Sequence, residues 1–170
     1  ESMNPDYCKD TSNTTLNFHN GRILSAWYNA GRVYSLDPLT LETEGEQDFA
    51  GGLDTPMNAH GKTDPRTGEF INYGYADFQP WLTYYVIGAD GSVKHRTRID
   101  LPGPRLPHDT TITPNYTILH DFPLFHDVDV LKRTGHRVVQ FKRDLPTRFG
   151  VIPRYGTQEQ VRWFEFEPGY

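Results

Sequence analysis

The sequence predicts an all-β fold made of many short strands. β-branched and aromatic residues gather in runs of about five to eight residues, turn-forming residues separate these runs, and almost no segment shows a helical period. Fifteen Gly and 13 Pro punctuate the whole length of 170 residues. Short strands with regular spacing are typical of a sandwich, a barrel or a propeller, and the strand pattern alone leaves these three open.

The first half of the chain contains five predicted strands with recognisable turns between them. Asn20-Gly21 favours a tight hairpin, because both residues adopt positive φ readily. The pairs Asp37-Pro38 and Asp64-Pro65 predict turns, since Pro presets φ and Asp can bond its neighbouring backbone. The five strands are predicted at residues 14–18, 22–28, 32–36, 69–75 and 81–87.

The second half continues the same pattern. Residues 88–91, Gly-Ala-Asp-Gly, predict a hairpin connection into the sixth strand. Four further strands are predicted, at residues 92–99, 116–121, 137–141 and 161–166. No linker or change of composition interrupts the chain, and its length suits one domain. We therefore expect residues 1–170 to form a single β segment with no second domain.

Composition excludes several classes of protein. The net charge of -5 gives no reason to expect a nucleic-acid partner. Cys8 is the only cysteine, so a disulfide within the chain and a cysteine-rich zinc site are both excluded. The apolar runs are far too short to span a bilayer, so we expect no transmembrane segment. The first residues lack the features of a signal peptide, and we expect a cytoplasmic protein.

Two of the seven histidines share a sequence context. His60 and His108 each stand in a loop-like approach to a β run, after Pro56 and Pro107, and they are 48 residues apart. One four-stranded propeller blade takes roughly 40 to 50 residues. Equivalent positions on successive blades face the same axis, so this spacing favours a propeller in which the two imidazoles converge and could hold a metal.

Other residues compete for this role. His120 and His126 stand beside carboxylates in "HDFPLFHD", and Asp109 and Asp121 are conceivable oxygen donors. The ordinary role of such carboxylates is hydrogen bonding at turns and strand ends. An isolated histidine near a strand is likewise more often hydrogen bonded in the core or at its rim. We expect the remaining histidines to be solvated, because they lie beside turns or among charges: His19, His95 and His136.

Several segments resemble the carotenoid cleavage oxygenase family. "AHGKTDPRTGEF" (residues 59–70) is similar to the family segment that bears the first iron ligand, and "PHDTTITPNYTILHDFPL" (107–124) to the segment that bears the second. "GRILSAWYNAGRVYSLDPLTLET" (21–43) and "RFGVIPRYG" (148–156) match further family segments. The resemblance extends over roughly residues 13–170 and is nearest the microbial and fungal group that includes lignostilbene dioxygenases.

The resemblance implies a fold, a metal and a reaction. The fold is a seven-bladed β-propeller, of which 170 residues supply about three to four blades. Four histidines hold Fe(II) on its axis, and O₂ cleaves an alkene double bond of a carotenoid, apocarotenoid or stilbene to carbonyl products. His60 and His108 match two of these ligands, and the other two have no counterpart in this chain.

Two departures from the family pattern bear on the site. Asn29 stands where family members generally carry a Glu that orients a ligand histidine, and an amide cannot raise imidazole basicity as a carboxylate does. Tyr28 stands where lignostilbene-cleaving relatives tend to carry a Lys that meets the phenolic hydroxyl, so Tyr28, which we expect to line the substrate pocket, counts against a stilbene substrate. We expect the 170-residue chain alone to be inactive. The alternative is a catalytically inactive propeller segment that acts as a binding scaffold.

Overall fold

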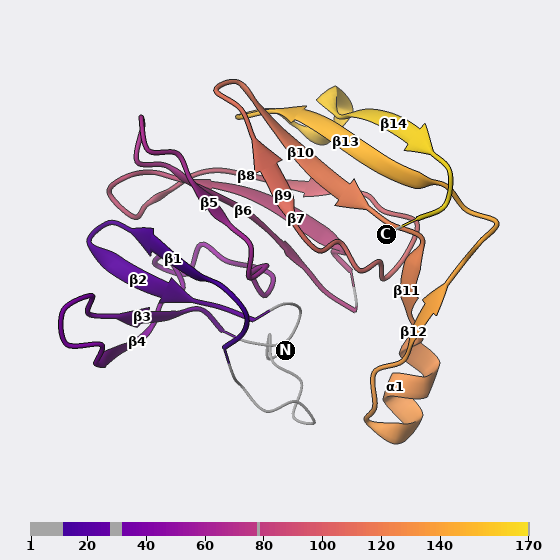
Figure 1. Ribbon diagram of the computed structural model, residues 1–170, viewed down its shortest axis with the longest axis horizontal. Helices are drawn as coiled ribbons and strands as arrows, with labels where there is room; N and C mark the ends of the chain where they lie inside the picture. Colours follow the sequence, from indigo (N-terminus) through magenta and orange to yellow (C-terminus); the bar gives the residue numbers. More distant parts are fainter. Residues whose placement is uncertain (1–11, 28–31, 78, 170) are drawn as a thin grey trace.

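The computed structural model describes residues 12–27, 32–77 and 79–169. These residues form three four-stranded antiparallel sheets and a two-stranded ribbon, which confirms the all-β prediction (Figure 1). Sheet 1 contains β1 (Leu16–His19), β2 (Arg22–Ser25), β3 (Tyr34–Leu36) and β4 (Thr43–Glu46). Sheet 2 contains β5 (Lys62–Thr63), β6 (Phe70–Tyr75), β7 (Leu82–Ile87) and β8 (Val93–Ile99).

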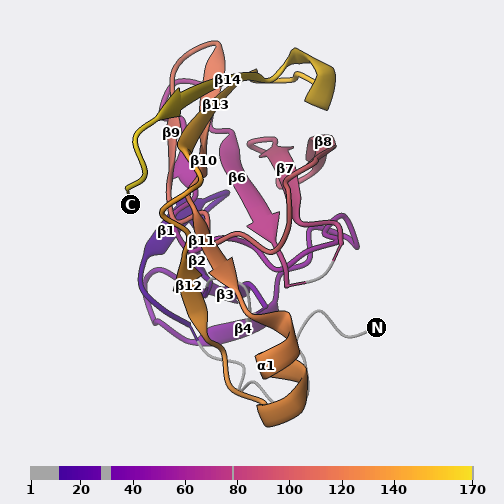
Figure 2. The ribbon, with the colours of Figure 1, turned by 90° about the vertical axis from the view of Figure 1, so that its right-hand side faces the viewer.

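Sheet 3 is interrupted by an excursion of the chain. It contains β9 (Thr110–Ile112), β10 (Tyr116–Asp121), β13 (Thr147–Pro153) and β14 (Arg162–Phe166), and the 3-10 turn Gln158–Gln160 precedes β14. Between β10 and β13 the chain forms the ribbon of β11 (Leu124–His126) and β12 (Val139–Phe141), with helix α1 (Val128–Thr134) at its tip. Figure 2 shows α1 at the lower end of the view, at the tip of the ribbon.

The turn residues act as the sequence predicts. Asn20 and Gly21 have φ values of 48° and 73°, and they join β1 to β2 in a two-residue hairpin. Asp37 Oδ1 accepts hydrogen bonds from the backbone N–H groups of Leu39 and Thr40, which closes the turn between β3 and β4.

The two central strands of sheet 2, β6 and β7, are buried on both faces. All residues of β6 and β7 are buried, and their side chains alternate between the two neighbouring sheets. Phe70 and Ile87 pack with Leu24 of sheet 1, whereas Ile71 and Tyr84 belong to the cluster that includes Leu119 and Ile152 of sheet 3. This double burial explains why β6 and β7 read as nearly continuous aromatic and aliphatic runs.

The sequence analysis was wrong about several elements. Helix α1 was not predicted, because seven residues are too few to show a helical period. Its ends do carry local signals, since the Asp127 side chain accepts from Val130 N and Gly135 adopts a left-handed φ of 71°. Five strands were also missed, most of them only two to four residues long: β4, β5, β9, β11 and β13.

The outer faces of sheets 1 and 3 expose large apolar side chains. On sheet 1, Leu16 and Phe18 are 63% and 61% exposed. On sheet 3, Phe164 and Phe166 of β14 are 51% and 56% exposed. The covered faces of these sheets carry apolar residues such as Leu24 and Trp163, so each outer sheet is apolar on both faces, as in a sheet that packs between two neighbours.

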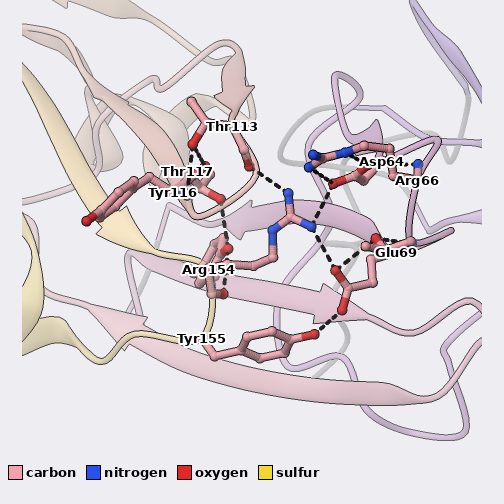
Figure 3. Close-up of polar contacts among 10 residues, drawn as sticks. Asp64, Arg66, Glu69, Thr113, Tyr116, Thr117, Arg154 and Tyr155 are labelled. Carbon is pink, nitrogen blue, oxygen red and sulfur yellow. Dashed lines mark hydrogen bonds and ion pairs between the residues drawn. The ribbon is translucent and has the colours of Figure 1, made fainter.

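A charged cluster joins sheet 2 to sheet 3 (Figure 3). Arg154, which follows β13, contacts Asp64 Oδ2 and Glu69 Oε2, each at 2.8 Å from its Nη1, and Nη2 donates to Thr113 O at 2.6 Å. The Tyr155 hydroxyl donates to Glu69 as well. The Arg154 and Asp64 side chains are 7% and 4% exposed, so the cluster fixes the two sheets through largely desolvated charges.

Among the described residues, no helix is long and apolar enough to cross a membrane.

The exposed apolar faces predict association of the 170-residue chain when it is produced alone. We expect oligomers or aggregates in size-exclusion chromatography with light scattering, because Leu16, Phe18, Phe164 and Phe166 present unpaired apolar surface. Replacing these four by Ser should shift the chain toward monomer. Replacing Leu39 and Leu41, which are exposed at the β3–β4 turn, by Ser serves as the control. This change should not shift the chain toward monomer. A monodisperse wild-type monomer with a sharp cooperative melt would contradict this expectation.

The charged cluster predicts an acid-dependent stability. Hydrogen bonds from Arg66 N and from Arg154 hold the pKa of the Asp64 carboxyl well below its ordinary value of 3.8. The stabilisation is therefore complete above about pH 4 and is lost as the pH falls below it. Asp64→Asn should lower the melting temperature at pH 7, and the difference from wild type should shrink in acid. Glu42→Gln, which removes an exposed carboxylate, is the control and should leave the melting temperature nearly unchanged. If the difference in melting temperature between Asp64→Asn and wild type does not vary with pH, Asp64 does not have this role.

Candidate functional site

The first strands of the three sheets lie side by side. β1 contacts β5, and β5 contacts β9, so the strand that opens each sheet forms part of one continuous inner surface (Figure 1). Thr63 of β5 donates a hydrogen bond to the backbone carbonyl of Phe18 in β1 at 2.8 Å, which fixes the first two strands relative to each other. The residues that directly precede these three strands are therefore brought to one end of this surface.

Three side chains meet at that end: Thr15 before β1, His60 before β5 and His108 before β9. The imidazole rings of His60 and His108 have centroids 4.8 Å apart, with an angle of 39° between their planes. The Thr15 Oγ1 and His60 Nδ1 atoms are 3.0 Å apart, within hydrogen-bond distance. The structure thus brings together the two histidines that the sequence paired, and it adds a threonine that the sequence analysis missed.

The electrostatic surroundings favour a neutral His60. Burial lowers the pKa of the His60 imidazole; the Asp109 carboxylate opposes this, whereas His108 and Lys62 lower the pKa further. An uncharged imidazole is the form that binds metal ions. Lys62 Nζ donates to His60 O at 3.0 Å and to Asp109 Oδ1 at 2.7 Å, so an ion pair also joins the segments that carry the two histidines.

The two alternative histidines make their own contacts. His120 is in β10, on the same face of sheet 3 as Tyr116 and Ile118, and its ring packs against Phe122 and Phe149. Burial lowers the pKa of the His120 imidazole; Asp109 opposes this, whereas His108 and Lys62 lower the pKa further, so His120 lies within electrostatic range of the candidate site. His126 is buried at the end of β11, where its Nδ1 contacts Asp77.

The expectation that His19 and His95 are solvated was wrong. His19 is 3% exposed, and its Nε2 contacts the backbone carbonyl of Gly88 at 2.9 Å. His95 is partly buried and contacts the carbonyl of Gly156 at 2.8 Å. Both partners lie more than 60 residues away in the sequence, so no local pattern reveals them. His136 is exposed, as expected.

The candidate carboxylates are engaged in ion pairs. Asp121 is fully buried between Arg105 and Arg148, whose Nε atoms lie 3.1 Å and 2.7 Å from its carboxylate oxygens. Burial raises the pKa of the Asp121 carboxyl, and both arginines oppose the shift. Asp109 pairs with Lys62. In the described part of the chain, no group of three or more His, Cys, Asp or Glu side chains is placed to hold a metal ion.

His60 and His108 therefore provide two imidazole donors on one side of an inner surface. Their chemistry suits a non-haem iron ion, for which neutral imidazole is a suitable ligand. Tyr28 and Asn29, the two other residues singled out in the sequence, lie outside the described residues.

Comparison with known proteins identifies close relatives. The chain is 36% identical over 163 residues to carotenoid 9,10(9',10')-cleavage dioxygenase 1 of Phaseolus vulgaris, covering 94% of this chain and 30% of that protein. It is 34% identical to resveratrol cleavage oxygenase 1 of Aspergillus fumigatus, covering 95% of this chain and 33% of that protein. The chain thus spans about a third of the length of these relatives.

Solved structures show the same architecture. The lignostilbene dioxygenase of Pseudomonas brassicacearum superposes with a TM-score of 0.82 at 35% identity, covering 90% of this chain and 32% of that one. The chain has the fold of part of a carotenoid oxygenase β-propeller, as predicted, although the number of blades it contributes stays a prediction.

The family model described as RPE65, retinal pigment epithelial membrane protein, matches residues 3–170. This match spans nearly the whole chain and agrees with the relatives and with the fold. The chain therefore belongs to the RPE65 family of carotenoid oxygenases.

Proposed function

We propose that this chain is a segment of a non-haem Fe(II)-dependent dioxygenase that cleaves an alkene double bond with O₂. The observation that carries the proposal is the short distance between the imidazole rings of His60 and His108, whose centroids are 4.8 Å apart. These two residues precede the first strands of sheets 2 and 3. Relatives named for cleavage of carotenoids and of resveratrol support the reaction class. The substrate is then a carotenoid, an apocarotenoid or a stilbene, and the products are two carbonyl compounds.

His60 and His108 are proposed as two of the iron ligands. An iron ion held by neutral imidazoles keeps positions open at which O₂ can be activated next to an alkene. The other ligands would come from the part of the longer protein that this chain does not include, since the relatives are about three times its length. For this reason we expect the 170-residue chain alone to be inactive. We keep the cytoplasmic location as a prediction.

Thr15 is proposed to orient His60. If His60 binds iron through Nε2, its Nδ1 carries the ring proton. The Nδ1–H group then donates a hydrogen bond to Thr15 Oγ1, which lies 3.0 Å away. This bond fixes both the tautomer and the plane of the ring, as the hydrogen-bond partners of ligand histidines generally do. Asn29 is proposed to support a further ligand histidine in the same way, and Tyr28 to line the substrate pocket.

A catalytically inactive scaffold is the second candidate. The observation that favours it is Asn29, an amide at the position where the family pattern has Glu. An amide can still orient an imidazole but does not raise its basicity, which weakens metal binding. Iron content and turnover of the full-length protein distinguish the two candidates.

The ligand assignment predicts the effect of removing either histidine from the full-length protein. His60→Ala and His108→Ala should each lose most of the bound iron and all detectable cleavage of carotenoids or stilbenes, because each removes an imidazole donor. Elemental analysis and product detection under air measure the two effects. His136→Ala, at an exposed histidine, is the control. Stoichiometric iron and full turnover in either variant would remove that histidine from the site.

The orienting role of Thr15 predicts a smaller effect. Thr15→Val keeps the shape of the side chain and removes the hydroxyl, so the full-length protein should bind Fe(II) about 10- to 100-fold more weakly, as is typical when such a partner is lost. Thr111→Val, at an exposed position of β9, provides the matched control. Equal metal affinity of the Thr15 variant and wild type in a competitive titration counts against the orienting hydrogen bond.

A further inference from the structure

Asn58 is a fully buried amide in the segment that leads to His60. Its exposed fraction is 0%. Its backbone is fixed against β6, because Asn58 N donates to Tyr73 O at 2.9 Å and Asn72 Nδ2 donates to Asn58 O at 2.8 Å. The residue is therefore anchored to the central sheet before its side chain makes any contact.

The Asn58 side chain connects the two histidine segments. Its Oδ1 accepts a hydrogen bond from His60 N at 3.0 Å, and its Nδ2 donates to His108 O at 2.9 Å. One planar group thus contacts the backbone of both histidines, although these precede strands of different sheets and lie 48 residues apart in the sequence.

Only an amide satisfies both bonds at this position. A carboxylate of the same shape lacks the donor for His108 O, and an aliphatic side chain lacks both groups. Burial makes the loss costly, because a backbone group left without a partner away from water is destabilised. Two further contacts act on these segments. Tyr73 Oη donates to Asp109 O at 3.0 Å, which holds the His108 segment to β6. The ion pair between Lys62 and Asp109 is more exposed, with side chains 36% and 43% accessible, so it holds the segments less firmly.

We propose that Asn58 is a positioning residue of the metal site: it sets the separation of the His60 and His108 imidazoles. The inference rests on the proposed function, since it assumes that both rings bind one metal ion. Asn58 itself binds no metal in this account. It acts through the two backbones, so its loss should weaken metal binding and alter the geometry of the site rather than remove a ligand.

The test uses metal binding by the metal-free, full-length protein, with Co(II) as the probe. Asn58→Ala removes both hydrogen bonds, and Asn58→Ser keeps a small hydroxyl as a milder change that supports folding. Both should raise the Co(II) dissociation constant about 10- to 100-fold and change the visible absorption of the bound Co(II). The melting temperature of each metal-free variant is measured in parallel.

A matched control separates positioning from general destabilisation. Tyr84→Phe removes a buried hydroxyl that contacts Thr117 Oγ1 at 2.8 Å and Arg154 O at 2.9 Å, away from the histidines. This variant should lose stability and keep the wild-type Co(II) affinity and spectrum. The inference is overturned if an Asn58 variant keeps wild-type affinity and absorption, or if Tyr84→Phe weakens binding equally.

A further variant distinguishes failure of this inference from failure of the proposed function. His60→Ala should lose Co(II) binding in the same titration. If it binds Co(II) as well as wild type, then His60 is not a ligand and the proposed metal site itself is wrong. If His60→Ala loses the metal but the Asn58 variants do not, the site stands and Asn58 has no positioning role.

Discussion

The burial of β6 and β7, the central strands of sheet 2, on both faces is the constraint on which the rest of the structure depends. Residues such as Phe70 and Tyr84 alternate between two apolar layers, so sheets 1 and 3 are each held against the same central sheet. Burial of this apolar surface is the main favourable contribution to the fold. The Arg154 cluster adds a second, polar link between sheets 2 and 3, which fixes their relative position.

The packing of the three sheets brings the residues of the candidate site together from separate segments of the chain. No single sequence motif contains all of them. The first strands of the three sheets, β1, β5 and β9, are neighbours in space. The residues that precede these strands are therefore close together. Thr15, His60 and His108 meet there from three separate sheets. Buried hydrogen bonds then refine the geometry, and a neutral imidazole at His60 follows from burial. A site of this kind is as rigid as the contacts between the sheets that carry it.

Sequence reasoning succeeded where local chemistry decides the structure. The Asn20-Gly21 hairpin and the strands around Phe70 and Tyr84 follow from turn preferences and from continuous apolar runs. The pairing of His60 with His108 was reached from spacing and family resemblance. Contacts between distant segments could not be predicted: the Gly88 carbonyl that partners His19 is one example. Thr15 and Asn58 were missed for the same reason, since each acts across a sheet boundary that only the fold defines.

The most direct test of this account is a crystal structure of the full-length protein loaded with Co(II), with anomalous diffraction used to locate the metal. The account predicts one strong anomalous peak within coordination distance of a ring nitrogen of both His60 and His108. A peak bound to neither histidine, or the two rings on opposite faces of the propeller, would contradict it.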